Sequence, residues 1–237
     1  MRCIGLIGGM SYHSTTDYYT GINAAVAAAR GGHHSAPLLL SSLDFADVRR
    51  FQEAGDWEGA GRLLAGHAAL LERAGAEAIV ICTNLMHKVA PQVAERVGVP
   101  LLHIVDAVAA QARRLGLNSL GILGARWTMT EPFYGDRLAV SGVTPVRASA
   151  ADVALTDAII FDELTRGVVT GSSRAALQGV VGRLGEAGAD GVLLGCTELP
   201  QILDAASSPL PVVDSTLAHV RAAAAFVLGE EPAALPG

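Results

Sequence analysis

The sequence predicts an α/β protein built from two pseudo-symmetric domains, each an open parallel sheet with helices around it. Two observations support this fold class. Short, continuously apolar runs, typical of strands buried on both faces, alternate with longer segments of helical spacing. Several motifs also occur twice, in the same order. Because ligands of open parallel sheets bind beyond the carboxyl ends of the strands, we expect the active site in the cleft between the two domains.

Eight apolar runs are predicted to form strands. They are Cys3–Ile7, Leu38–Leu43, Ala78–Cys82, Leu101–Val105, Leu120–Leu123, Thr144–Ala148, Val192–Cys196 and Val212–Asp214. Four of the intervening segments have the apolar spacing of amphipathic helices and few helix breakers. They are Trp57–Ala74, Asp106–Leu115, Ala175–Ala187 and Ser215–Leu228.

Three pairs of segments carry the internal repeat. They are Gly5–Gly9 with Gly121–Ala125, Arg73–Ala78 with Glu186–Gly191, and Pro100–Asp106 with Pro211–Asp214. A single match can arise by chance, whereas three in the same order indicate a duplicated unit. We therefore predict a first domain over residues 1–100, a second over residues 101–210, and a C-terminal segment, 211–237, that returns to the first domain.

The composition excludes several functional classes. The chain has 237 residues, of which 51% are hydrophobic and 17% charged, with a net charge of −6 and no basic run. Nucleic acid is therefore not an expected partner. The apolar runs are too short to span a membrane, and Ile4–Ile7 is too short for the core of a secretory signal. We expect a cytoplasmic protein.

The cysteines and glycines also limit the choice of cofactor. Neither Cys82 nor Cys196 has a second cysteine or a histidine at the spacing of a structural zinc site, so no metal is expected. The glycines of Gly5–Gly9 lack the spacing of a dinucleotide-binding loop. We predict that the protein uses no cofactor.

Cys82 and Cys196 occupy matching points of the repeat, each after an apolar strand and before a threonine. One thiolate and one thiol at a single cleft can remove a proton from one face of a carbon and return a proton to the other. Either cysteine alone is better explained as a small core residue, but their pairing in a repeat beside polar residues favours the catalytic role. Cys3, which has no polar neighbours in the sequence, is assigned to the core. We expect helix starts and nearby donors to lower the thiol pKa values.

Polar residues beside the two cysteines are candidates for stabilising a carbanion. Thr83, Asn84 and Thr197, with adjacent backbone amides, can donate to a substrate carboxylate as negative charge develops. Glu198 follows the second cysteine and is interpreted either as a proton relay or as a charged residue at a helix start. His87 is expected on a helix surface.

Three motifs identify a resemblance to a known family. They are Gly8–Ser11, Cys82–Lys88 and Gly195–Glu198, and together they resemble the aspartate/glutamate racemase family over essentially the whole chain. The resemblance implies a racemase that needs no pyridoxal phosphate, usually a homodimer, acting on a small amino acid. It also implies that Cys82 and Cys196 are the acid/base pair, and that the substrate-binding residues are Met10, Gln52, Thr83, Asn84 and Thr197.

Two departures from the family pattern concern the substrate side chain. Relatives that act on acidic amino acids carry a lysine where this chain has Leu155, and many have a threonine where it has Leu85. Burying a carboxylate without a cation costs several kcal/mol, so a neutral amino acid is the expected substrate. Arg49, Arg50 or Arg166 can replace the missing lysine if the fold turns one of them inward.

Two other functions remain open from the sequence. The chain can be a lyase, isomerase or decarboxylase of the same superfamily acting on a small carboxylic acid, although decarboxylation requires only one proton donor. It can also be a non-catalytic protein that binds small carboxylates, in which case no α-proton exchange is expected.

Overall fold

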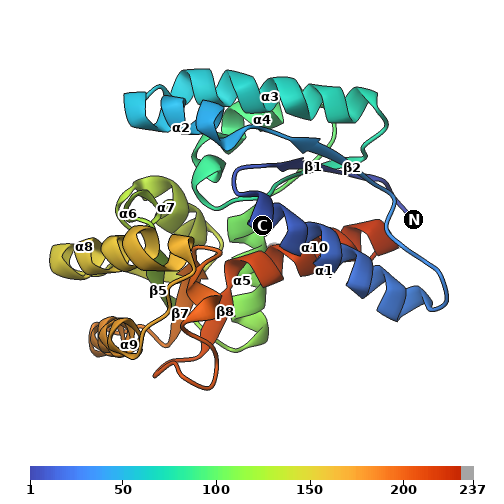
Figure 1. Ribbon diagram of the computed structural model, residues 1–237. Helices are drawn as coiled ribbons and strands as arrows, with labels where there is room; N and C mark the ends of the chain where they lie inside the picture. Colours follow the sequence, from blue (N-terminus) through green and yellow to red (C-terminus); the bar gives the residue numbers. More distant parts are fainter. Residues whose placement is uncertain (231–237) are drawn as a thin grey trace. The chain divides into compact units, whose positions relative to one another are not determined.

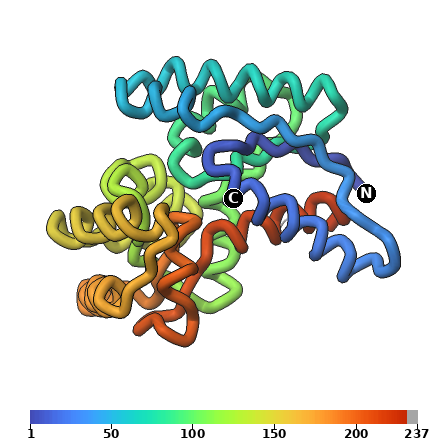
Figure 2. The backbone as a smooth tube through the Cα atoms, viewed as in Figure 1, coloured from blue at the N-terminus to red at the C-terminus, as the bar shows by residue number. Residues whose placement is uncertain are grey.

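The computed structural model describes residues 1–230, so residues 231–237 of the predicted C-terminal segment lie outside the described residues. The chain divides into two compact units. The first comprises Met1–Ile104 and the described residues from His219 onward, and the second comprises Val105–Ala218. Figures 1 and 2 show the elements of each unit along the chain.

The first unit is a four-stranded parallel sheet flanked by helices (Figure 1). Its strands are β1 (Ile4–Gly8), β2 (Leu38–Ser42), β3 (Ala78–Ile81) and β4 (Leu101–Leu102). Its helical segments are α1 (Tyr12–Arg30), α2 (Phe45–Ala54), α3 (Trp57–Arg73), the short 3-10 helix η1 (Leu85–Val89) and α4 (Ala90–Arg96). The C-terminal helix α10 (Ser215–Leu228) joins this unit from His219 onward.

The second unit has the same construction. Its strands are β5 (Ser119–Gly124), β6 (Thr144–Val146), β7 (Gly191–Gly195) and β8 (Val212–Asp214). Its helical segments are α5 (Ile104–Arg114), α6 (Arg126–Thr130), α7 (Pro132–Val140), α8 (Ala150–Ala158), the π-helix η2 (Ile159–Glu163), the 3-10 helices η3 (Leu164–Arg166) and η4 (Leu199–Gln201), and α9 (Gly171–Glu186). α5 begins at Ile104, the last residue of the first unit.

The strand orders confirm the predicted fold class. They are β2-β1-β3-β4 in the first unit and β6-β5-β7-β8 in the second, and all pairings are parallel. Each of the eight predicted strands overlaps an observed one. Two α/β units of identical strand order are what the repeated motifs predict.

One carboxylate precedes an inner strand of each sheet, Glu77 before β3 and Asp190 before β7. Glu77 accepts a hydrogen bond from the N–H of Cys3 at 2.8 Å. Asp190, at the matching point of the repeat, accepts from the N–H groups of Asn118 and Ser119 at 2.8 and 2.9 Å. Each carboxylate therefore satisfies backbone donors at the start of the neighbouring strand, which the sheet alone leaves unpaired.

Strand alternation divides the first sheet between two cores. Ile7, Ile79 and Ile81 pack among residues of α3 and α4 on one face. On the other face a second cluster joins alternate residues of β1 and β3 to α1 and α10. It contains Ile4, Leu6, Ala78, Val80 and Cys82 from the sheet and its end, with Tyr18, Ile22, Val26, Val220, Ala223, Ala224, Phe226 and Val227 from the helices.

The two helices on this second face lie side by side (Figures 1 and 2). A Cβ at Gly21 of α1 would come within 2.7 Å of Val220 of α10, so the glycine permits the close approach. α1 is not among the predicted helices, because its Thr, Tyr and Gly residues have modest helix propensity. Its formation depends on the buried stripe of Tyr18, Ile22 and Val26.

The return of the chain to the first unit occurs later than predicted. β8 pairs with β7 in the second sheet, and only the residues from His219 belong to the first unit. Residues 211–218 therefore differ from the predicted assignment, because the apolar run before Ser215 completes the second sheet. Within residues 1–230, no helix is both long enough and apolar enough to cross a membrane.

Candidate active site

Cys82 is the first residue after β3, and its backbone forms a tight turn. Its N–H donates to the carbonyl of Ile7 at 2.9 Å, and the N–H of Thr83 donates to the carbonyl of Ile81 at 2.9 Å. The second bond spans only three residues, so Cys82 is the centre of a γ-turn-like reversal. Its side chain has no solvent exposure and belongs to the core cluster under α1 and α10.

Cys82 does not have the lowered pKa expected from the sequence. Burial raises the pKa of its thiol above the ordinary value of 9.0. The segment that follows is the short 3-10 helix η1 rather than an α-helix start. Without an α-helix N-terminus at the sulfur, desolvation determines the direction of the shift.

Three predicted substrate-binding residues lie around the same end of the first sheet. Met10 follows β1 and is buried in one apolar cluster with Met86. Gln52 of α2 is also buried, and its Nε2 donates to the sulfur of Met86 at 3.3 Å. Asn84 is buried and Leu85 is partly exposed in the segment after Cys82. The fold therefore brings Met10 and Gln52 onto the segment that begins with Cys82.

Gly9 gives the loop after β1 its shape. Its φ of +83° favours glycine, and a Cβ there would be 2.1 Å from the carbonyl oxygen of Leu43. The N–H of Gly9 donates to Oγ1 of Thr15 at 2.9 Å, which fixes the loop to the first turn of α1. Thr15 was not identified from the sequence, although it precedes Tyr18 on the buried face of α1.

His87 is not on a helix surface, as the sequence predicted, but is buried with 2% exposure. Its Nδ1 lies 2.8 Å from the carbonyl oxygen of Thr83, and its Nε2 accepts from the N–H of Ile104 at 3.2 Å. The rings of His103 and His219 lie 4.5 and 5.5 Å from the His87 ring. In the sequence, the position of His87 five residues after Cys82 was the only feature that could have pointed to a role at the site.

Cys196 occupies the corresponding strand end of the second unit, but its surroundings are polar. Its Sγ donates to Oε2 of Glu198 at 2.9 Å, and Oγ1 of Thr197 donates to the same oxygen at 2.8 Å. All three residues are partly exposed. Glu198 therefore faces the thiol directly, as a proton acceptor must.

The pKa of Cys196 is also raised rather than lowered. Burial, followed by the charge and side-chain hydrogen bond of Glu198, raises it well above the ordinary value of 9.0. The backbone N–H groups of Glu198 and Thr197 act in the opposite direction, because they favour the thiolate. The predicted backbone donors are therefore present at this cysteine, but they are outweighed.

The two cysteines are not strict structural equivalents. In the first sheet Ile7 pairs with Ile81, so Cys82 comes opposite Gly8, whereas in the second sheet Gly124 pairs with Gly195. Cys196 therefore follows the position that matches Cys82 by one residue. In both sheets a glycine lets a helix approach closely, Gly121 with Leu184 of α9 and Gly5 with Leu71 of α3.

Leu155, the predicted determinant of the substrate side chain, lies on α8 with 38% exposure. Asp157 on the same helix accepts from the N–H of Arg126 at 2.7 Å, which ties α8 to the loop after β5. This bond places the helix of Leu155 at the carboxyl end of the second sheet.

Each of the three arginines considered as replacements for the missing lysine has a carboxylate partner. Arg49 pairs with Glu53 at 2.8 Å and also lies 3.4 Å from Oε1 of Gln52. Arg50 pairs with Asp47, and Arg166 lies 3.9 Å from Asp162. These pairs are within single helical segments and are exposed or partly exposed.

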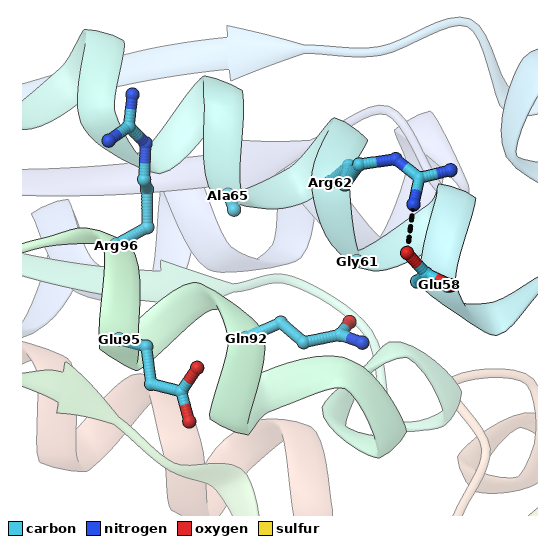
Figure 3. A pocket seen from close by; sticks show the side chains of 7 residues that line it. All are labelled: Glu58, Gly61, Arg62, Ala65, Gln92, Glu95 and Arg96. Carbon is cyan, nitrogen blue, oxygen red and sulfur yellow. Dashed lines mark hydrogen bonds and ion pairs between the residues drawn. The ribbon is translucent and has the colours of Figure 1, made fainter.

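A hollow in the first unit lies between α3 and α4, and none of the predicted site residues lines it (Figure 3). Its lining includes Arg62, which pairs with Glu58, and Gln92, whose amide packs against Gly61. The lining contains no nucleophile. Among residues 1–230, no group of three or more His, Cys, Asp or Glu side chains is arranged to hold a metal ion.

The protein is thus an α/β protein with two parallel sheets of identical strand order. In each sheet an inner strand is followed directly by a cysteine, Cys82 after β3 and Cys196 after β7. The family model for Asp/Glu/hydantoin racemases matches residues 7–223. The chain therefore belongs to the Asp/Glu/hydantoin racemase family, as the motifs predicted.

Solved structures agree with this assignment. A candidate Asp/Glu racemase from Yersinia pestis is 42% identical, with a TM-score of 0.92 over 96% of this chain and 100% of that one. An aspartate racemase homologue from Pyrococcus horikoshii is 31% identical, with a TM-score of 0.84 over the same shares. A variant of arylmalonate decarboxylase, at 19% identity and a TM-score of 0.52 over 99% of this chain and 97% of that one, shares the fold.

Proposed function

We propose that the protein is a cofactor-independent amino-acid racemase in which Cys82 and Cys196 act on opposite faces of one α-carbon. The observation that carries the proposal is the presence of a thiol at the carboxyl end of an inner strand in each sheet, one of them bonded to a carboxylate. Membership of a racemase family supports it. The proposal requires that both units contribute to a single site.

The first step begins at Cys196. Both thiols hold their protons at neutral pH because burial raises their pKa values. Glu198 accepts the Cys196 proton, and the resulting thiolate is favoured by the backbone N–H groups of Glu198 and Thr197. The thiolate then takes the α-proton of the substrate, and the electron pair left on the carbon moves toward the substrate carboxylate.

The second step uses Cys82. Its thiol, held neutral by burial, gives its proton to the opposite face of the carbanion, and the configuration of the α-carbon is inverted. Cys82 is then a thiolate and Glu198 is protonated, and exchange of one proton with solvent at each group restores the starting state. In the reverse direction Cys82 must become the base. No carboxylate hydrogen bond to its sulfur is seen in the described structure, so the ammonium group of the substrate is its proposed activator, because a nearby positive charge lowers a thiol pKa.

The remaining predicted residues bind the substrate in this proposal. Thr83 and Asn84 follow the first thiol, and Thr197 follows the second. Met10 and Gln52 complete the end of the first sheet, where their contacts with Met86 hold them against the Cys82 segment. The Thr197 hydroxyl has an additional role, since its bond to Glu198 orients the carboxylate that serves Cys196.

Exchange of the α-proton in D2O tests the proposal. L- and D-amino acids are incubated with the wild type, Cys82→Ala and Cys196→Ala, and followed by NMR and chiral chromatography. The wild type is expected to exchange and invert one or a few amino acids, and each variant to lose inversion by about 10³-fold or more. Exchange of no amino acid by the wild type contradicts the proposal.

We further propose that the substrate is a neutral amino acid. Leu155 and Leu85 are apolar, and Arg49, Arg50 and Arg166 are already paired with carboxylates. Leu155→Lys is expected to raise aspartate turnover at least about tenfold, since a buried carboxylate then has a cation. Ala154→Lys, which adds the same charge at the neighbouring exposed position, is the control. No gain from Leu155→Lys counts against this model of the side-chain pocket.

A decarboxylase or lyase of the same fold is the alternative. It needs one proton donor, so a cysteine in each unit favours racemisation. Release of CO2 from a substituted malonate, dependent on one cysteine only, would reverse this preference.

The family resemblance also leads us to propose a homodimer in the cytoplasm, which sedimentation and cell fractionation test directly.

A further inference from the structure

We propose that His87 is a positioning residue that fixes the peptide after Cys82 and thereby the geometry of the first thiol. The inference deepens the proposed racemase function and rests on it. The ring nitrogens of His87 bond backbone groups of Thr83 and Ile104, so His87 is proposed to act through the backbone.

Two contacts hold the segment after Cys82 to His87. Nδ1 of His87 lies 2.8 Å from the carbonyl oxygen of Thr83, and the backbone N–H of His87 donates to the carbonyl of Asn84 at 3.1 Å. Thr83 also closes the turn centred on Cys82 through its N–H. Thr83, the residue after the cysteine, is therefore bonded through both of its backbone groups, its N–H by the turn and its carbonyl by His87.

The partners define the protonation of the imidazole. A carbonyl oxygen only accepts, so Nδ1 carries the proton toward Thr83. A backbone N–H only donates, so Nε2 receives the bond from Ile104 with a lone pair. His87 is therefore a neutral imidazole with the proton on Nδ1, and each of its nitrogens has a fixed role.

The surroundings prevent the ring from turning away. It is 2% exposed and meets the rings of His103 and His219 edge-on. His219 is itself fixed, because its Nε2 lies 2.8 Å from the carbonyl oxygen of Leu102 and its Nδ1 lies 2.8 Å from the hydroxyl of Tyr18.

The same ring contacts both ends of the first unit's discontinuous chain. Ile104, which donates to His87, is the last residue of the unit before the chain leaves it, and His219 is the first residue after the chain returns. His87 thus links the segment after Cys82 to the residues at which the chain leaves and re-enters this unit.

Two substitutions separate the two bonds. The amide nitrogen of Asn can occupy the position of Nδ1, so His87→Asn keeps a donor for Thr83 and loses the acceptor for Ile104. The amide of Gln reaches the position of Nε2, so His87→Gln keeps the acceptor and loses the donor. Racemisation constants, thermal unfolding and site-resolved alkylation rates are measured for both.

If His87 positions the Cys82 peptide, His87→Gln lowers kcat about 10- to 100-fold with KM within about threefold, whereas His87→Asn stays within about fivefold of the wild type. Alkylation of Cys82 then changes at least about fivefold in His87→Gln, while Cys196, the internal reference, does not. Equal losses in both variants, or an unchanged Cys82 rate in folded His87→Gln, overturn the inference.

A measurement on the wild type needs no substitution. Nitrogen-15 shifts of the His87 ring are expected to show a protonated Nδ1 and an unprotonated Nε2, and the opposite tautomer overturns the inference. If no amino acid is racemised at all, the proposed function fails, but the tautomer and the alkylation rates still decide the role of His87.

Discussion

The segments around Cys82 and Cys196 occupy matching strand ends in two sheets of identical order, yet their chemistry differs. Cys82 is enclosed in an apolar core, and its backbone is fixed by a buried histidine. Cys196 is partly exposed, and its thiol donates to Glu198. The two positions also differ by one residue in register, since Cys82 comes opposite Gly8 and Gly195, not Cys196, pairs with Gly124. Within residues 1–230 the duplication provides two thiols, and a carboxylate is seen bonded to the Cys196 thiol but not to the Cys82 thiol.

Replacing that carboxylate gives the largest expected effect. Glu198→Gln is expected to lower racemisation by about 10²- to 10³-fold, because the Cys196 proton loses its acceptor. The thiol pKa falls at the same time, since the nearby negative charge is removed, so alkylation of Cys196 at pH 8 becomes faster. Activity assays and peptide mass spectrometry measure the two quantities.

Glu95→Gln, on the exposed surface of α4, is the matched control for this experiment and should change neither quantity. Loss of both activity and alkylation in folded Glu198→Gln would show that the carboxylate supports the loop and does not act as a base.

The loops after β1 and β5 provide the second comparison. Gly9 has a φ of +83° and no room for a Cβ, whereas Ala125, at the matching point, has a φ of −61°. Gly9→Ala is expected to lower the free energy of unfolding by about 3 kcal/mol or more, and Ala125→Gly by about 1 kcal/mol or less. Urea unfolding measures both, and similar losses would contradict the asymmetry of the loops.

Alkaline pH is expected to destabilise the protein through its buried thiols. Their folded-state pKa values are raised, so the folded state retains protons that the unfolded chain releases above about pH 9. Stability is therefore complete below pH 9 and falls as pH rises, by up to about 1.4 kcal/mol per pH unit for each thiol. Cys82→Ser should reduce this slope between pH 8.5 and 10, as measured by unfolding at successive pH values. An unchanged slope would show that Cys82 titrates similarly in both states.

The smallest expected effect concerns the carboxylates that start the central strands. Burial tends to raise the pKa of Asp190, but the hydrogen bonds from Asn118 and Ser119 outweigh this and hold the pKa below its ordinary value of 3.8. Asp190 therefore stabilises the fold above pH 3.8, and this contribution is lost as pH falls. Asp190→Asn should lower the free energy of unfolding by about 1–2 kcal/mol at pH 7 and weaken its dependence on pH in acid. Glu77→Gln should lower it less, because Glu77 accepts from one backbone N–H, that of Cys3. Unfolding at pH 7 and pH 3 measures both, and equal costs would contradict the difference in donor number.

Much of the fold could be predicted from the sequence, because continuous apolar runs identify strands that are buried on both faces. Helices such as α1 escaped prediction, since tertiary burial of Tyr18, Ile22 and Val26 outweighs weak local propensity. The β8 strand was predicted with its observed bounds but assigned to the wrong unit, since it pairs with the preceding strand β7 and the chain returns to the first unit only within α10. The missed helix depends on contacts between segments far apart along the chain, which local sequence patterns do not show.

The candidate site shows the same limit. The positions of Cys82, Cys196 and Glu198 at strand ends follow from the motifs. The raised thiol pKa values do not, because they depend on the burial of each sulfur in the folded chain and, at Cys196, also on the charge of Glu198. The burial of His87 could not be predicted either, since its two hydrogen-bond partners are backbone groups that any residue type carries.

α10 is translated after the strands of both sheets, and this order affects how the chain can fold during synthesis. Residues 105–218 are contiguous and can fold as a unit as soon as they leave the ribosome, since domains generally fold as units during synthesis. The first unit cannot, because Val220, Ala223, Phe226 and Val227 of α10 cover the sheet face that contains Cys82. Before residues 219–228 are translated, only α1, through Tyr18, Ile22 and Val26, can cover that face. The Cys82 thiol is therefore less enclosed in a nascent chain that lacks α10 than in the folded protein.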